Sequence, residues 1–142
     1  MRLLYESLTD FSEGRSLLAI FKLATSVEIL CDRTFERYLE MKGIPKELRG
    51  ALVRSGRSWN ARFDRAARIM PEHIELSEIR EFRDSKKVFD ETVRQFRDSF
   101  AHNDQATATY QDAKRSFNSS VPIFWALDRL QEAMTKKSTE LR

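Results

Sequence analysis

The chain has 142 residues, of which 41% are hydrophobic and 11% aromatic, and its net charge is +3. This length favours a single domain over residues 1–142 that buries about two-thirds of its unfolded surface, and the composition excludes wholesale disorder. Four glycines and three prolines are too few for the turns of an all-β fold, and a single cysteine excludes an internal disulfide.

The first 56 residues predict two helices. Asp10-Phe11-Ser12-Glu13 has the pattern of a capping box, so a long helix is expected from there to about Leu39. Apolar residues at helical spacing mark its buried face, namely Leu17, Phe21, Ala24, Val27, Cys31, Phe35 and Tyr38. Gly43 and Pro45 end this helix, and Pro45 suits the first turn of a short helix that reaches Ser55-Gly56.

Two further helices are predicted between residues 58 and 103. Ser58 can cap the first, which Pro71 closes and whose apolar face comprises Trp59, Phe63, Ala66 and Met70. Ser77 can cap the second. Its apolar residues recur at spacings of three and four, except at Lys86: Ile79, Phe82, Phe89, Val93, Phe96 and Phe100.

The last predicted helical segment runs from about Ala106 to Lys137. Its apolar residues are Tyr110, Ala113, Phe117, Phe124, Leu127 and Met134. Because Pro122 lies inside it, we expect a kink or a restart capped by Ser119 or Ser120. The sequence shows no convincing alternation of period two, no repeat and no linker. It therefore predicts an all-α fold, an antiparallel bundle of four to five helices.

The segment Arg97-Asp98-Ser99-Phe100-Ala101-His102-Asn103 stands at the end of the fourth predicted helix. It places a guanidinium, a carboxylate and an imidazole within six residues. A histidine can move a proton near neutral pH, and an arginine can hold a phosphate through two parallel hydrogen bonds. Since RNA supplies its own nucleophile, the 2′-hydroxyl, these groups are a minimal set for cleaving RNA without a metal.

The spacing alone carries little weight, because Arg68-Ile69-Met70-Pro71-Glu72-His73 repeats it. Three features distinguish the second copy: the polar Asp98 follows its arginine, a small residue precedes its histidine, and no proline interrupts it. We therefore interpret His73 as a surface or helix-edge histidine. Arg97, Asp98 and His102 are the candidate catalytic residues.

Helical geometry sets a condition on this site. In a continuous helix Asp98 and His102 share a face, whereas Arg97 lies about 140° from His102. Arg97 and His102 can therefore converge only if the helix ends or bends near Ala101, or if a second subunit completes the site. Asn103-Asp104 suits such an exit, because both residues tolerate turn conformations.

At this motif the chain resembles the HEPN superfamily of small helical bundles, which carry an arginine, a polar residue, a short spacer and a histidine at a helix end. Active members are metal-independent endoribonucleases, usually homodimers, in toxin–antitoxin, phage-defence and RNA-processing settings. The resemblance implies that His102 moves the proton, Arg97 stabilises the phosphate and Asp98 positions one of them. It also implies RNA as substrate, an antitoxin protein as a further partner, and no metal or cofactor.

One position departs from the family pattern. HEPN toxins paired with nucleotidyltransferase antitoxins often carry a tyrosine two residues after the histidine, where AMP is attached. This chain has Asp104 there, and Tyr110 is too distant to replace it. We therefore do not expect control by that modification at that site.

A second class of function is a catalytically inactive interaction module, such as an antitoxin, immunity or adaptor protein. In that alternative Arg97 pairs with Glu91, Asp98 or a neighbouring helix, and His102 caps the helix C-terminus, where a cation is favourable. The same fold and the same basic region are expected. The two classes differ in whether Arg97 and His102 are needed for activity.

Basic side chains concentrate in residues 42–68, where eight basic and two acidic residues give a local charge of +6. A polyanion would meet this region first, so five arginines are candidates for binding RNA phosphates: Arg54, Arg57, Arg62, Arg65 and Arg68. A third class of function is a bundle that binds nucleic acid here without cleaving it. The alternative is a solvated helical face, and the spacing of Trp59 and Phe63 favours core positions over base stacking.

Other chemistry finds little support in the sequence. His73, His102 and Cys31 have no recognised metal-ligand spacing, and Cys31 lies on a predicted buried face, where a core role is favoured over a nucleophilic one. The N-terminal residues lack the apolar run of a signal peptide, and no uncharged run approaches the ~20 apolar residues of a membrane helix. We therefore expect a cytoplasmic protein without membrane contact.

Overall fold

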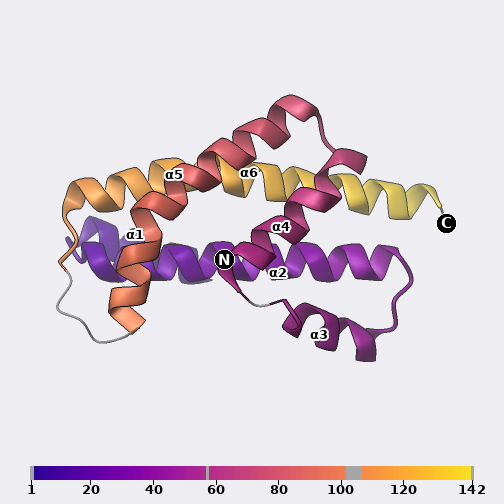
Figure 1. Ribbon diagram of the computed structural model, residues 1–142, viewed down its shortest axis with the longest axis horizontal. Helices are drawn as coiled ribbons and strands as arrows, with labels where there is room; N and C mark the ends of the chain where they lie inside the picture. Colours follow the sequence, from indigo (N-terminus) through magenta and orange to yellow (C-terminus); the bar gives the residue numbers. More distant parts are fainter. Residues whose placement is uncertain (1, 57, 102–106, 142) are drawn as a thin grey trace. The chain divides into compact units, whose positions relative to one another are not determined.

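The computed structural model describes residues 2–56, 58–101 and 107–141, and of residues 95 and 98–101 the backbone alone. Within these ranges every regular element is a helix (Figure 1), which confirms the predicted all-α class. The described elements are α1 (Arg2–Ser12), α2 (Ser16–Met41), α3 (Lys46–Arg54), α4 (Trp59–Ile69), a 3-10 helix (Met70–Glu72), α5 (Leu76–Ala101) and α6 (Tyr110–Glu140). Six α-helices are thus described where four to five were expected.

The chain divides into two compact units. Unit 1 comprises Met1–Val27 and Asp84–Ile123, and unit 2 comprises Glu28–Arg83 and Phe124–Arg142. Helices α2, α5 and α6 each contribute residues to both units, so the division falls inside helices and not at a linker. Each unit is described separately below.

The start of the chain contradicts the capping box predicted at residues 10–13. Asp10 lies inside α1 and is only 3% exposed, and its carboxylate binds Arg15 Nη2 and Lys22 Nζ, each at 2.7 Å. The turn that follows depends on Gly14, whose φ of +77° is in the left-handed region. The backbone N–H of Arg15 donates to the Asp10 carbonyl at 2.8 Å, as in a Schellman C-cap. The predicted helix start is therefore a helix end.

Contacts inside unit 1 connect α1 to the first half of α2 and to the start of α6. The Ser7 hydroxyl donates to the carbonyl of Ala19 at 2.8 Å, and both residues are fully buried. The Phe11 ring stacks on Tyr110, with centroids 4.9 Å apart, and lies 5.1 Å from the Phe117 ring. The aromatic contacts pair segments that are about a hundred residues apart in sequence.

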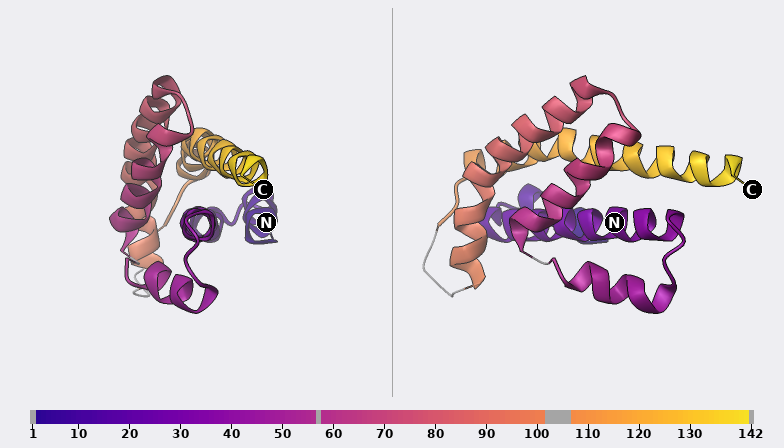
Figure 2. Two further views of the ribbon diagram at one scale, coloured as in Figure 1. Left: turned by 90° about the vertical axis from the view of Figure 1, so that its right-hand side faces the viewer. Right: turned by 45° about the vertical axis from the view of Figure 1, so that its right-hand side comes forward.

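In unit 2 the chain reverses after α2. Gly43 has a φ of +77°, and the N–H of Ile44 donates to the Leu39 carbonyl at 3.0 Å, so α2 ends as the glycine predicted. Figure 2 shows α3 turning back along the second half of α2, with Pro45 as its N-cap. The predicted short helix is therefore confirmed, with Pro45 one position before the first turn.

The core of unit 2 contains an aromatic cluster. The ring centroids of Trp59 and Phe63 are 5.2 Å apart, and those of Phe63 and Phe82 are 6.0 Å apart. Trp59 is 7% exposed, and the two phenylalanines are each 1% exposed. Trp59 and Phe63 are therefore core residues, as their spacing favoured, and they are not available to stack on bases.

The predicted helix starts have mixed outcomes. The Ser58 side chain accepts a hydrogen bond from the N–H three residues on, at 3.2 Å, which confirms it as the cap of α4. Ser77 does not cap α5, because that helix begins one residue earlier. For α6, the Thr109 hydroxyl accepts from the Asp112 N–H at 3.1 Å and the Thr109 N–H donates to the Asp112 carboxylate at 2.8 Å. This reciprocal pair is a capping box.

The restart predicted at Pro122 is wrong, because α6 runs without interruption over Tyr110–Glu140. The serine hydroxyls before the proline bond within the helix: Ser119 donates to the Ser116 carbonyl at 3.0 Å and Ser120 to the Phe117 carbonyl at 2.7 Å. Because both serines lie inside the uninterrupted helix, neither is the N-cap of a second helix.

Candidate active site

The candidate catalytic motif lies at the end of α5, in unit 1. Arg97 is half-buried and Asp98 follows it on the helix, while His102 lies outside the described residues. Phe89 and Val93 anchor this part of α5, since both are fully buried. They fix the rotation of the helix about its axis, and with it the direction in which Arg97 leaves the backbone.

The helical backbone of α5 limits where the chain can bend to bring Arg97 and His102 together. Since α5 is helical through Ala101, a bend that lets Arg97 meet His102 cannot lie before Ala101. Convergence therefore needs a change of direction beyond that residue, or a second subunit.

His73, the histidine of residues 68–73, was interpreted as a surface or helix-edge residue; it does lie at a helix edge, but its side chain is not on the surface. Its side chain is 1% exposed, although it does follow the 3-10 helix directly and its N–H donates to the Met70 carbonyl at 2.9 Å. The Nε2 atom is buried without a hydrogen-bond partner in the described part of the chain, and Glu72 Oε2 is 4.0 Å away. Burial, reinforced by the positive charge of Lys137, lowers the pKa of His73.

Two of the five arginines predicted to bind RNA form ion pairs inside unit 2. Arg62 binds Glu28 at 3.1 Å and Asp32 at 3.0 Å, and Arg65 binds the same Asp32 oxygen at 3.3 Å. Arg65 also donates to two carbonyls near the end of α3, each at 3.2 Å, and lies 4.2 Å from the centroid of the Phe35 ring. The Arg62 and Arg65 side chains are only 11% and 16% exposed. Their guanidinium groups connect α2, α3 and α4 and do not face solvent.

Of the other three arginines predicted to bind RNA, the two that the structure describes are not held in this network of ion pairs. Arg54 and Arg68 are exposed, on α3 and α4, and Arg57 lies outside the described residues. The structure therefore does not bring the five arginines onto one exposed face. Binding of RNA by Arg54 and Arg68 stays a prediction.

Cys31 is a core residue, as its place on the buried face of α2 indicated. It is 1% exposed, and burial raises the pKa of its thiol to about 12. Because the thiolate is the nucleophilic form of cysteine, a thiol in this environment is unreactive near neutral pH. No group of three or more His, Cys, Asp or Glu side chains that could hold a metal ion is found among the described residues.

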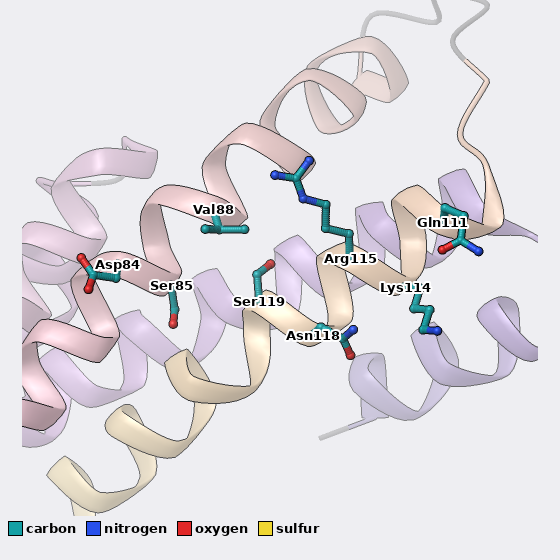
Figure 3. A pocket seen from close by; sticks show the side chains of 8 residues that line it. All are labelled: Asp84, Ser85, Val88, Gln111, Lys114, Arg115, Asn118 and Ser119. Atoms are coloured by element: carbon teal, nitrogen blue, oxygen red, sulfur yellow. The ribbon is translucent and has the colours of Figure 1, made fainter.

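A groove that the sequence reasoning missed lies between α5 and α6 inside unit 1 (Figure 3). Its volume is about 490 Å³, and its lining residues are Asp84, Ser85 and Val88 from α5, and Gln111, Lys114, Arg115, Asn118 and Ser119 from α6. The available signal was the spacing of polar, hydrogen-bonding residues along one side of α6. It was overlooked because these residues fall outside the most basic stretch of the sequence.

Comparisons of the chain with protein-family models, with curated proteins and with solved structures find no match. In the described ranges no helix is both long enough and apolar enough to cross a membrane.

Proposed function

We propose that the protein is a metal-independent endoribonuclease of the HEPN type that acts as a homodimer. The observation that supports this best is the position of the motif at the end of a 26-residue helix. Arg97 and Asp98 occupy its last two turns, and His102 is the next residue after its described end. The buried Phe89 and Val93 give the motif a rigid support, which a site for oriented chemistry requires.

In the proposed reaction the 2′-hydroxyl of RNA attacks the adjacent phosphorus, and the 5′-oxygen of the next nucleotide leaves. The products are a 2′,3′-cyclic phosphate and a 5′-hydroxyl. His102 takes the proton from the attacking hydroxyl, and the leaving oxygen takes a proton from solvent. Arg97 donates hydrogen bonds to the phosphate oxygens as charge develops on them, and Asp98 positions one of these two groups.

The proposed homodimer follows from the geometry of α5. If the helix continued beyond Ala101, Arg97 and His102 would lie about 140° apart around it, so the paired motifs of two subunits offer a way to assemble both groups around one phosphate. We propose the same settings that the HEPN resemblance implies, a toxin–antitoxin system or phage defence, with an antitoxin protein as partner. The competing function is the catalytically inactive interaction module.

The test is cleavage of RNA in EDTA by wild type, Arg97→Ala and His102→Ala. We expect wild type to cleave, His102→Ala to lose about 10²–10⁴-fold in rate as for removal of a general base, and Arg97→Ala to lose about 10²–10³-fold as for removal of a charge-stabilising donor. Equal cleavage by all three would refute the assigned roles. A folded wild type that cleaves none of the RNAs tested would favour the interaction module.

A further inference from the structure

The groove between α5 and α6 carries cations that, unlike Arg62 and Arg65, are exposed to solvent. Lys114 and Arg115 are both exposed on α6 (Figure 3). Within the described part of the chain Lys114 makes no ion pair. Arg115 has a carboxylate of Glu91 at 3.9 Å, with side chains that are 63% and 55% exposed. An ion pair this exposed contributes little, so a phosphate can replace Glu91 at small cost.

The donors of α6 are arranged along the groove. Gln111, Lys114, Arg115 and Asn118 are all exposed and share one side of the helix, because they are spaced by three, four and seven residues. Gln111 and Asn118 are seven residues apart, or about 10 Å along the axis. Each carries N–H groups that can donate to phosphate oxygens. This row of donors suits an extended polyanion better than a single ion. It comprises an amide, an ammonium, a guanidinium and a second amide.

The charge of the groove is uneven along its length. In Figure 3, Asp84 lies at one end and Gln111 at the other, with Arg115 reaching toward α5 between them. The cations Lys114 and Arg115 therefore lie toward the Gln111 end of the groove, away from Asp84. Val88 is 37% exposed and lines the opposite wall, where an apolar surface can contact a ribose or a base.

We infer that this groove binds the phosphate backbone of single-stranded RNA, and that Lys114 and Arg115 make the charged contacts. The inference rests on the proposed function for the identity of the polyanion, because that function makes RNA the substrate. The groove and Arg97 belong to the same compact unit, so RNA held here stays in the unit that carries the candidate catalytic motif. The inference adds one lysine and one arginine of α6 to Arg54 and Arg68, for which RNA binding stays a prediction.

The test is the affinity of a fluorescently labelled single-stranded RNA, measured by anisotropy on a His102→Ala background to prevent cleavage. The double substitution Lys114→Ala/Arg115→Ala is expected to weaken binding by at least about tenfold at low salt. It should also reduce the slope of log K against log salt by about 1.4, since each neutralised phosphate of a single strand contributes about 0.7. Circular dichroism checks that the variants are folded.

The matched control is Arg80→Ala/Arg83→Ala, which removes the same charge from two exposed positions of α5 outside the groove. Its affinity should equal that of the background protein. The inference is overturned if the groove variant binds RNA as well as the control does. It is also overturned if Arg54→Ala/Arg68→Ala accounts for the loss of affinity instead.

The two proposals fail separately in these experiments. Cleavage that depends on Arg97 and His102, together with an unchanged affinity of the groove variant, overturns the inference and leaves the proposed function in place. Binding that depends on Lys114 and Arg115, with no cleavage by wild type, supports the groove and overturns the ribonuclease. A wild type that neither binds nor cleaves RNA overturns both.

Discussion

At the scale of single residues, His73 shows how burial determines the role of a histidine. Its imidazole is 1% exposed and has no hydrogen-bond partner on Nε2 among the described residues, so the neutral form is favoured and the pKa is lowered. A largely buried imidazole that favours its neutral form is a poor partner for an RNA phosphate. Residues 68–73 therefore repeat the spacing of residues 97–102 in an environment that does not suit the chemistry proposed for that motif.

Burial of His73 predicts a specific pH dependence of stability. The unfolded chain takes up a proton as pH falls through the ordinary histidine pKa of 6.5, whereas the folded chain resists it. Stability contributed by neutral His73 is therefore present above that pH and is lost as pH falls toward the lowered pKa, by at most about 1.4 kcal/mol per pH unit for one proton. The free energy of unfolding in urea, measured between about pH 7 and pH 5, should show this decline.

The variant His73→Phe removes the titrating group and keeps an apolar ring in the site. Its stability should vary less with pH over the same range than that of wild type. Carboxylates with lowered pKa values, such as Asp10 beside Lys22, lose their contribution only at lower pH and do not interfere. An identical pH dependence in the two proteins would show that His73 does not titrate as proposed.

At the scale of elements, the spacing of apolar residues predicted the buried faces of helices well, because a buried face depends on residues that are close in sequence. Ile79, Phe82, Phe89 and Val93 recur at helical spacing and are all buried on α5. The helix start predicted at residues 10–13 is wrong, because Asp10-Phe11-Ser12-Glu13 has the residue types of a capping box without its position at a helix start. The decisive residue was Gly14, which permits the left-handed backbone that ends α1.

The packing of α4 on α2 depends on contacts that periodicity cannot show. Arg62 reaches a carboxylate 30 residues away, and Arg65 reaches the same carboxylate over 33 residues. The sequence shows such arginines as positive charge, and only the fold shows that Glu28 and Asp32 neutralise them. This is why the charge of residues 42–68 predicted one basic face, although the fold pairs two of its arginines with carboxylates.

The bridging role of Asp32 predicts the effect of removing its charge. One of its oxygens binds both Arg62 and Arg65, so Asp32→Asn leaves two largely buried guanidiniums short of a partner. We expect a loss of about 1–3 kcal/mol in the free energy of unfolding in urea. The control is Asp64→Asn, which removes an exposed carboxylate from α4 and should change stability by less than about 0.5 kcal/mol. Equal effects of the two substitutions would contradict the bridging role.

At the scale of the whole molecule, the proposed homodimer predicts how defective subunits complement one another. If each site takes Arg97 from one subunit and His102 from the other, a mixed dimer of Arg97→Ala and His102→Ala contains one intact site. Random exchange of subunits should then restore roughly a quarter of wild-type cleavage. If both groups come from one subunit, mixing restores nothing, and the motif must converge within a single chain.

The central claim is that the end of α5 cleaves RNA without a metal. The most direct measurement compares the rate constants of RNA cleavage in EDTA for Arg97→Ala and Arg94→Ala, two single arginine removals one turn apart on α5. Arg94 is exposed and has no part in the proposed chemistry. We predict that Arg94→Ala cleaves like wild type and that Arg97→Ala is slower by about 10²–10³-fold. Equal rate constants for the two variants would contradict the claim.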